Sequence, residues 1–310
     1  MVAEAGKQYS RFFCGVADMK DVTASVNTPK VKDKALGVLG KLPPFSPILN
    51  RLIASLANED VSFAKAADLI EKDTVLAGNI LRLVNSALYG LRGTVNSIRH
   101  AIALLGLAKL RNAALSMSVA RMWSQVKCPA GWSMNRFNLH SVAVAILADA
   151  VTQRRAANYA EGAFAAGLFH DLGQLLVALG LPQEFERITG LCNGGKPQSE
   201  VESEVLGITH AELSAAALAV WNLPESIQTA VRYHDNSMLD PTILGPGELS
   251  LSMVLQAADH HVKAVGISVG LFEDQTVHQG PTLKSIGLGD QLPIVISEFE
   301  NEFAVIKPYF

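Results

Sequence analysis

The sequence has few cysteines, and their arrangement excludes a disulfide framework. Only three of the 310 residues are cysteine, Cys14, Cys128 and Cys192, and no two of them form a CxxC pair. An odd and scattered set of this kind is typical of a protein whose thiols stay reduced. We therefore expect a cytoplasmic protein without disulfide bonds.

Long hydrophobic runs and a signal sequence are also missing. The N-terminus, MVAEAGKQYSRFFCG, has no apolar segment of the kind that targets a chain for export. The longest apolar stretch, around 163–181, is interrupted by His170, Asp171 and Gln174. A membrane helix needs about 20 consecutive, predominantly apolar residues. The sequence therefore predicts no membrane association.

Charge is sparse and shows no basic excess. Charged residues make up 18% of the chain, with 26 Lys and Arg against 29 Asp and Glu, for a formal net charge of −3. Proteins that bind nucleic acid through its phosphates need a positive surface, so nucleic acid is not an expected partner. Hydrophobic residues are plentiful at 49%, which is enough for a sizeable core.

Apolar residues recur at helical spacing along most of the chain, and alternating runs of the strand type are nearly absent. In 74–90 the apolar positions are three and four residues apart, with Asp73 as the expected N-cap and Gly90 as the expected end. Further helices are expected at 97–123 with a break at Gly106, and at 138–153, 160–180, 199–206, 210–221, 224–233, 249–266 and 293–305. We predict an all-α protein.

Shifts in composition divide the chain into four predicted parts. A mixed segment, 124–137, contains proline and glycine and separates two helical regions, and one short helix is expected near 8–20. The four parts are 1–31, a weakly structured leader; 32–125, an N-terminal helical part; 126–270, a second helical part; and 271–310, a C-terminal loop and helix.

Histidines and aspartates recur about once per predicted helix. The series is His140, His170-Asp171, His210, His234 and Asp259, with gaps of 24 to 39 residues, each about one helix and one connection. Antiparallel helices joined in this way can bring one residue from each helix to a shared place. One central helix can offer both His170 and Asp171, because neighbouring helical residues point about 100° apart. Thr209 and Glu212 form a capping-box pattern that places His210 in a first helical turn.

These residues offer imidazole nitrogens and carboxylate oxygens, which suit Fe, Mn, Zn, Co or Ni in an open, octahedral-like site. A structural zinc site prefers thiolates instead. A bound cation would also explain how Asp171 is tolerated in an apolar run, because burying an unpaired charge is costly. Taken singly, each histidine has a simpler interpretation as a core or surface residue with one hydrogen bond. No role is assigned to His100, His260, His261 and His278.

The ordered series resembles the H…HD…H…H…D motif of the HD superfamily of metal-dependent phosphohydrolases. The upstream sequence is similar to the HDOD family, the HD-related output domain, through short motifs; these are Leu42-Pro43, Asp73, Asn85-Ser86-Ala87, Tyr89-Gly90, Ala101-Ile102 and Leu105-Gly106. Downstream, 207–227 fits the same family, and the resemblance covers roughly 38–266. It implies an HD-like multi-helix bundle, with metal bound in 126–270, and an additional N-terminal helical subdomain.

The resemblance also implies one or two divalent metal ions, with Fe or Mn favoured and Zn, Ni or Mg as alternatives. The implied ligands of the first ion are His140, His170, Asp171 and Asp259. Asp171 would bridge to a second ion held by His210 and His234, and Asp235 is a further candidate ligand of that ion.

The chain departs from the active cyclic-dinucleotide phosphodiesterases of the superfamily at three places. Those relatives carry HDxGK, a pair of adjacent histidines and a GYP segment. Here Gln174 stands in place of the lysine, and His234-Asp235 stands in place of the histidine pair. The following residues, NSMLDP, contain no Gly-Tyr-Pro. Arg136 and Lys196 are the nearby candidates for replacing the lost positive charge.

Three functional hypotheses follow. The favoured one is a bacterial-type signalling or regulatory HDOD module that retains the metal site, binds a nucleotide-type or phosphate ligand there, and presents its N-terminal helices to a protein partner. The alternative is an active metal-dependent phosphohydrolase acting on a phosphomonoester or phosphodiester, with His170 and Asp171 catalytic. A DNA-reading helix pair at 97–115 is disfavoured, because 107–117 has only two basic residues and is otherwise largely apolar.

Overall fold

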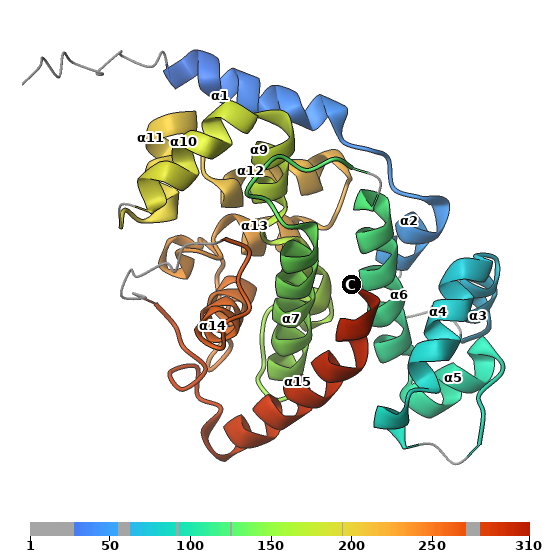
Figure 1. Cartoon of the computed structure of the whole chain (residues 1–310). Helices are drawn as coiled ribbons and strands as arrows, with labels where there is room; N and C mark the ends of the chain where they lie inside the picture. The colour runs from blue at the N-terminus through green and yellow to red at the C-terminus, as the bar shows by residue number, and fades with distance from the viewer. Residues whose placement is uncertain (1–27, 55–62, 91–92, 125, 194, 271–279) are drawn as a thin grey trace, which may run out of the picture.

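The computed structural model describes residues 28–54, 63–90, 93–124, 126–193, 195–270 and 280–310. Within these residues every named element is helical, and the one extended feature is an isolated parallel bridge between Ala157 and Leu249. The all-α prediction is therefore confirmed. Figure 1 shows the helices arranged around one long helix, α7 (Met134–Thr152).

The N-terminal helices form a group beside the rest of the molecule. Their bounds are α1 (Thr28–Gly37), α2 (Pro47–Ala54), α3 (Phe63–Glu71), α4 (Thr74–Val84), α5 (Ile98–Leu105) and α6 (Leu107–Trp123). Helices α2 to α6 pack on one another, and α6 also contacts α7 and α8, which joins this group to the remaining helices. Helix α1 instead lies across the top of the view in Figure 1 and packs on α11.

The remaining helices form a bundle that surrounds α7. Their bounds are α8 (Ala163–Phe169), α9 (Leu172–Gly180), α10 (Pro182–Cys192), α11 (Gln198–Leu206), α12 (His210–Val220), α13 (Glu225–Arg232), α14 (Leu251–Ala264) and α15 (Leu292–Ile306). Helices α8, α14 and α15 pack directly on α7, while α12 packs on α9 and α13. In Figure 1, α15 runs diagonally along α7 and its C-terminal end reaches the side of α6.

Side-chain caps determine where several helices begin. In each case a hydroxyl or carboxylate oxygen accepts a hydrogen bond from the backbone N–H three residues later, which satisfies one of the otherwise unpaired first-turn donors. The capping residues are Asp73, Ser97, Ser133, Thr209 and Ser250. At Thr209 the reciprocal bond from Glu212 is also present. The predicted cap at Asp73 and the predicted capping box before His210 are both confirmed.

The core of the bundle is densely packed around α7 and α8. Helix α7 is buried around nearly its whole circumference, and α8 approaches it so closely at Gly167 that a Cβ there would lie 2.6 Å from the Cα of Ala145. One described stretch, Ala160–Gly180, is long and apolar enough to cross a membrane, but it is almost entirely buried inside the protein. Helices α5 and α6 reach the same threshold only as a pair bent by 119°.

The predicted single helix over 160–180 is wrong at its centre. Helix α8 ends at Phe169 and α9 begins at Leu172, so His170 and Asp171 lie in the break between two helices. The backbone leaves helical geometry at Asp171, with φ −95° and ψ 10°, and the Gly173 N–H donates to Ser214 Oγ at 2.7 Å. The hydrogen bond to Ser214 satisfies an N–H group of the new helix, so the break leaves this donor paired.

Other boundaries also differ from the predictions. The helix expected over 74–90 ends at Val84, because the Asn85 side chain bonds to both backbone groups of Val95, each at 2.7 Å, and turns the chain. Helix α10 has no counterpart among the predicted helices, and α1 begins inside the predicted leader. His140 lies seven residues into α7, not at its start, and His234 lies just beyond the end of α13. The short helix expected near 8–20 falls outside the described residues.

Candidate metal centre

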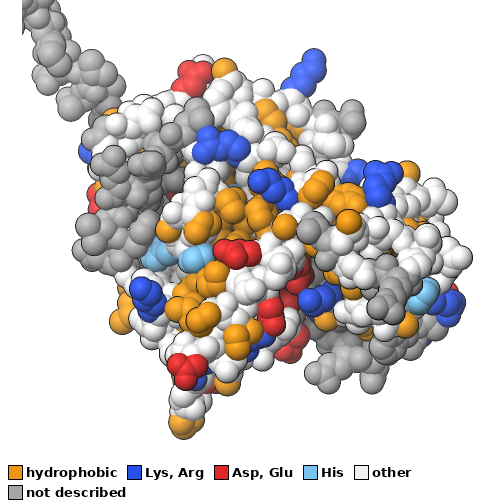
Figure 2. All heavy atoms as spheres, turned by 60° about the horizontal axis from the view of Figure 1, so that its bottom comes forward, with side chains coloured by type: hydrophobic (Ala, Val, Ile, Leu, Met, Phe, Trp, Pro, Cys, Tyr) orange, Lys and Arg blue, Asp and Glu red, His pale blue; other side chains and the backbone are white. Residues whose placement is uncertain are grey.

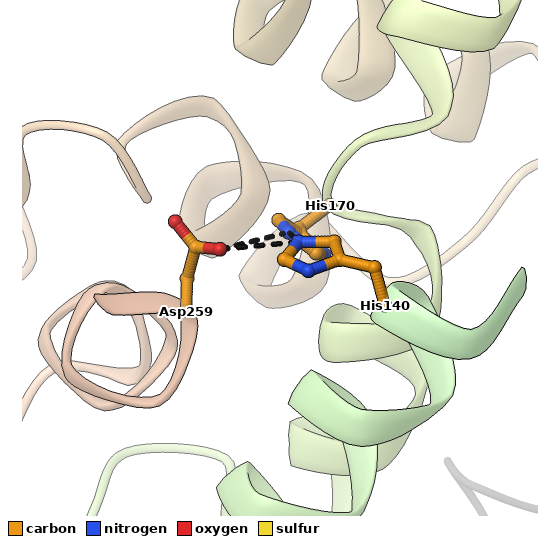
Figure 3. A group of neighbouring side chains, drawn as sticks. All are labelled: His140, His170 and Asp259. Carbon is orange, nitrogen blue, oxygen red and sulfur yellow. Dashed lines mark hydrogen bonds and ion pairs between the residues drawn. The ribbon is translucent and has the colours of Figure 1, made fainter. Parts of the chain in front are cut away.

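Four helices and one helix break bring the predicted histidines and aspartates together. His140 comes from α7, the His170-Asp171 pair from the α8–α9 break, and His210 is the first residue of α12. His234 follows α13, and Asp259 lies in the second half of α14. All six residues are buried. Figure 3 shows that the side chains of His140, His170 and Asp259 point toward one another from three elements. We call these six residues, together with Asp235, the His/Asp cluster.

One ring nitrogen of each histidine in the cluster is fixed by a hydrogen-bond acceptor outside it. The Nδ1 atoms of His140, His170 and His234 lie 2.7 to 2.8 Å from the carbonyl oxygens of Ile267, Gly167 and Val231. The Nδ1 atom of His210 lies 2.7 Å from a carboxylate oxygen of Glu202. Carbonyl and carboxylate oxygens only accept, so each Nδ1 carries the proton. In a neutral ring the Nε2 atom then presents a lone pair, and all four Nε2 atoms face the cluster.

The first half of the cluster is built around one oxygen of Asp171. Asp171 Oδ2 lies 3.2 Å from His140 Nε2 and 3.3 Å from His170 Nε2. Asp259 Oδ1 lies 3.1 Å from His140 Nε2 and 3.8 Å from His170 Nε2. The two Nε2 atoms are themselves 3.2 Å apart. Two nitrogens and two carboxylate oxygens therefore surround one small volume.

The second half of the cluster is built around the other oxygen of Asp171. Asp171 Oδ1 lies 3.3 Å from His210 Nε2 and 3.6 Å from His234 Nε2. Asp235 closes this half, with Oδ2 at 3.3 Å from His210 Nε2 and Oδ1 at 3.4 Å from His234 Nε2. A single carboxylate thus faces two separate sets of nitrogens, one with each oxygen.

The separations within the cluster fit ligands that share a cation. Two ligand atoms about 2.1 Å from a common ion are about 3.0 Å apart in octahedral and about 3.4 Å apart in tetrahedral geometry. Several of the buried atoms have no hydrogen-bond partner among the described residues; they are both oxygens of Asp171, Nε2 of His210 and His234, and Oδ1 of Asp259. Buried polar groups without partners are costly, and these all point at the same space. A divalent cation fits this set of donors.

The electrostatics of the cluster strongly favour the binding of positive charge. Burial opposes protonation of His170, but Asp171 and Asp259 outweigh burial and raise its pKa to about 10. Burial also opposes ionisation of Asp171, yet the surrounding histidines hold the pKa of its carboxyl well below the ordinary value. The three carboxylates therefore attract either protons onto the imidazoles or a metal ion between them.

Sequence reasoning missed two charged residues at the cluster. Glu202 on α11 is buried, and one carboxylate oxygen accepts from both the Nδ1 and the backbone N–H of His210, each at 2.7 Å. Lys263 on α14 places Nζ 2.7 Å from Asp259 Oδ2. The i,i+4 spacing of Asp259 and Lys263 was a usable signal, whereas nothing in the sequence marked Glu202.

Within the described part of the chain, the cluster is most exposed at Asp235 and Lys263, which we call its open edge. The side chains of Asp235 and Lys263 are 28% and 23% exposed, whereas those of the other ligand candidates are 4% exposed or less. A ligand that approaches from solvent would meet these two residues first. A basic group thus lies at this edge, although Gln174 stands where the sequence motif was expected to carry a lysine.

The two residues expected to replace that lysine are engaged elsewhere. Arg136 donates from Nε to the carbonyl of Ser268 at 3.1 Å and also bonds to the carbonyl of Gly270. Lys196 pairs with Glu204 at 3.0 Å on the surface. The structure places Lys263, not Arg136 or Lys196, beside the carboxylates.

Comparisons with known proteins agree with this architecture. The family model of the HDOD domain matches residues 42–237. A curated but uncharacterised protein of Treponema pallidum is 24% identical over 218 residues, which are 70% of this chain but only 42% of that longer protein.

Three solved structures share the fold at 20–21% sequence identity. An HDOD domain protein of unknown function from Geobacter sulfurreducens has a TM-score of 0.71 over 90% of this chain and 99% of its own. A protein from Shewanella amazonensis, named as a candidate phosphohydrolase, has a TM-score of 0.67 over 90% and 98%. One from Marinobacter aquaeolei, named as a candidate signal transduction protein, has a TM-score of 0.63 over 92% and 65%.

Proposed function

The chain belongs to the HDOD domain family, and we propose that it is a signalling or regulatory module that retains a site for two divalent metal ions in its His/Asp cluster. One observation carries the proposal: four imidazole Nε2 atoms and three carboxylates converge with their lone pairs on two adjacent volumes. Without a cation, most of these acceptors would be buried against one another.

The proposed division of the ligands follows the two oxygens of Asp171. The first ion would be held by His140, His170, Asp259 Oδ1 and Asp171 Oδ2. The second would be held by His210, His234, Asp235 and Asp171 Oδ1. Mixed nitrogen and oxygen ligands favour Fe or Mn, with Zn, Ni or Mg as alternatives.

When bound, divalent ions at such a site would polarise a phosphoryl oxygen and acidify a coordinated water. The chain's own residues would orient the metal ligands and place a basic group beside the site. Backbone carbonyls and Glu202 hold the imidazoles in one tautomer and orientation. Lys263 stands at the open edge, where its ammonium can attract the phosphate of a nucleotide-type ligand. We therefore propose that the ligand of the module is anionic and enters between Asp235 and Lys263.

A protein partner is part of the same proposal, and we assign it to the N-terminal helices. Val75 on α4 and Leu104 on α5 are large apolar side chains that are 58% and 45% exposed. Figure 2 shows that hydrophobic side chains also gather near the middle of one face, with acidic and basic side chains around them. The candidate signal transduction protein that shares the fold supports a role in contacting partners.

The alternative function is a working metal-dependent phosphohydrolase with His170 and Asp171 catalytic. The complete ligand set and the nearby Lys263 favour it. Gln174 and the missing Gly-Tyr-Pro segment oppose it. A turnover assay with a generic aryl phosphodiester and added Mn²⁺ or Fe²⁺ distinguishes the two: hydrolysis by the wild type that Asp171→Asn abolishes would make the chain an enzyme.

Elemental analysis of the purified protein tests the metal proposal itself. We expect about two divalent ions per chain, a loss of both in Asp171→Asn, and an unchanged content in His100→Ala, a matched control on α5 outside the cluster. A wild type that contains no metal, and takes up none on incubation with Mn²⁺, Fe²⁺ or Zn²⁺, would overturn the proposal.

A further inference from the structure

A groove separate from the His/Asp cluster lies between the N-terminal helices and α7. Its volume is about 340 Å³, within the range of small-molecule sites. Its lining comes from α4, α6, α7 and the short helix η6 (Lys307–Tyr309), including Asn138 of α7. Asn138 is two residues from His140, and residues two apart on a helix point about 200° apart. Helix α7 therefore turns opposite faces to the groove and to the cluster.

Two carboxamides face this groove without a partner. Asn79 on α4 and Asn138 on α7 line it and are partly buried, and neither side chain has a hydrogen bond to the part of the chain that the structure describes. A third amide, Asn135, donates to the carbonyl of Phe310 at 2.7 Å. Each free carboxamide offers a donor and an acceptor side by side. A ligand that forms hydrogen bonds with both amides needs an adjacent donor and acceptor on each of two of its edges.

Most of the remaining lining residues are apolar or aromatic, and the charge of the one arginine among them is neutralised by an ion pair. Leu76 and Met117 are buried in the wall, and Tyr309 contributes an aromatic ring. Arg121 is the one charged side chain among the described residues of the lining, and its guanidinium binds both oxygens of Asp73. The groove therefore offers flat apolar contact and amide hydrogen bonds, and its described lining has no free basic side chain for a phosphate.

We propose that this groove binds the base of a nucleoside, which is planar, uncharged and carries adjacent donors and acceptors. Asparagine amides pair with base edges in this bidentate way, and aromatic and apolar side chains stack on base faces. A base held by Asn79 and Asn138 touches α4 and α7 together. Its binding stabilises the packing of the N-terminal helices on the bundle, and the thermal midpoint rises with ligand concentration.

Calorimetric titration and thermal unfolding with adenosine, guanosine, cytidine and uridine test this proposal. We expect at least one nucleoside to bind and to raise the midpoint. Asn79→Leu and Asn138→Leu should each weaken binding by roughly tenfold or more. Asn301→Leu, which removes an exposed amide on α15 outside the lining, should bind like the wild type. Asn138→Asp, which keeps the shape but removes the donor, serves if Asn138→Leu misfolds.

His170→Ala separates this groove from the metal centre. Nucleoside binding should survive that substitution, because His170 does not line the groove. The proposal is overturned if none of the four nucleosides binds, if the two asparagine variants bind as tightly as the wild type, or if binding is lost in His170→Ala. None of these results would bear on the metal content of the cluster, so the two proposals fail separately.

Discussion

Replacing Glu202 by glutamine should weaken metal binding at only one half of the cluster. Glu202 Oε2 accepts two hydrogen bonds from His210, and Oε1 accepts one from Gln198 Nε2 at 2.8 Å. Glutamine retains one oxygen that can accept both bonds from His210, and its new amide nitrogen can donate to the Gln198 side-chain oxygen once the Gln198 amide turns over. The geometry is then preserved while the charge is lost. The variant therefore isolates the electrostatic contribution of the carboxylate to the basicity of His210.

The expected loss of metal affinity follows from the strength of the hydrogen bonds between residue 202 and His210. Hydrogen bonds to charged groups contribute about 1.5–3 kcal/mol, against about 0.5–1.5 kcal/mol for neutral ones. The midpoints of these ranges differ by about 1.25 kcal/mol, which corresponds to roughly a tenfold loss of affinity at the site that His210 serves. Glu202→Ala removes the acceptor entirely and should cost closer to a hundredfold.

Titration with Mn²⁺ in a chelator buffer, followed calorimetrically, resolves this effect. We expect two binding steps in the wild type and a weakening of one step only in Glu202→Gln. Glu204→Gln, two residues away on the same helix and paired with Lys196 on the surface, is the matched control and should leave both steps unchanged. Equal weakening of both steps, or no change in either, would refute the assignment of His210 to a distinct second site.

Three further outcomes are expected. Gly173→Ala should lower the free energy of unfolding by about 2–3 kcal/mol in denaturant, because its Cβ would lie 2.1 Å from the His210 carbonyl oxygen. Gly190→Ala is the control: a Cβ there would have nothing within 4 Å, so the free energy of unfolding should change by less than about 1 kcal/mol. A loss of stability in Gly190→Ala as large as that in Gly173→Ala would contradict this reasoning. Burial and Glu302 raise the pKa of Asp149 from 3.8 to about 6, so native-state stability is lost as pH rises between these values. Asp149→Asn should therefore stabilise the protein above pH 6 by up to about 3 kcal/mol and have little effect below pH 4, as measured by thermal unfolding across pH. A uniform effect at all pH would argue against the shift. Chelation should lower the thermal midpoint of metal-loaded wild type, since a ligand at 100 times its Kd adds about 2.7 kcal/mol, and should leave Asp171→Asn unaffected, because that variant lacks the carboxylate shared by both proposed sites. An equal response in both proteins would place the stabilising metal elsewhere.

The recurrence of histidine and aspartate about once per predicted helix was enough to predict which side chains would meet. His140 and Asp259 are 119 residues apart, yet their side chains come within 3.1 Å because each predicted helix contributes one residue to the same interior. The starts of two helices could also be predicted, because Asp73 and Thr209 accept hydrogen bonds from N–H groups in the helical turn that immediately follows them.

The features of the site that could not be predicted from the sequence depend on tertiary packing. The break at His170-Asp171 interrupts an apolar run with no proline to mark it, and the freed Gly173 N–H is satisfied by Ser214, 41 residues later. Glu202 is buried where it accepts hydrogen bonds from His210 at the start of α12, a contact that depends on how α11 packs. The i,i+4 spacing of Asp259 and Lys263 is common on helices and does not by itself mark a site. The predicted division of the chain between 125 and 126 stays a prediction.

Anomalous diffraction from crystals grown with Mn²⁺, recorded above and below the manganese edge, tests the central claim most directly. We expect two peaks on either side of the Asp171 carboxylate, about 3.5–4 Å apart, one near His140 and His170 and the other near His210 and His234. A cluster that shows no anomalous peak, with its imidazoles and carboxylates in the same positions, would contradict the claim that these residues form a metal site.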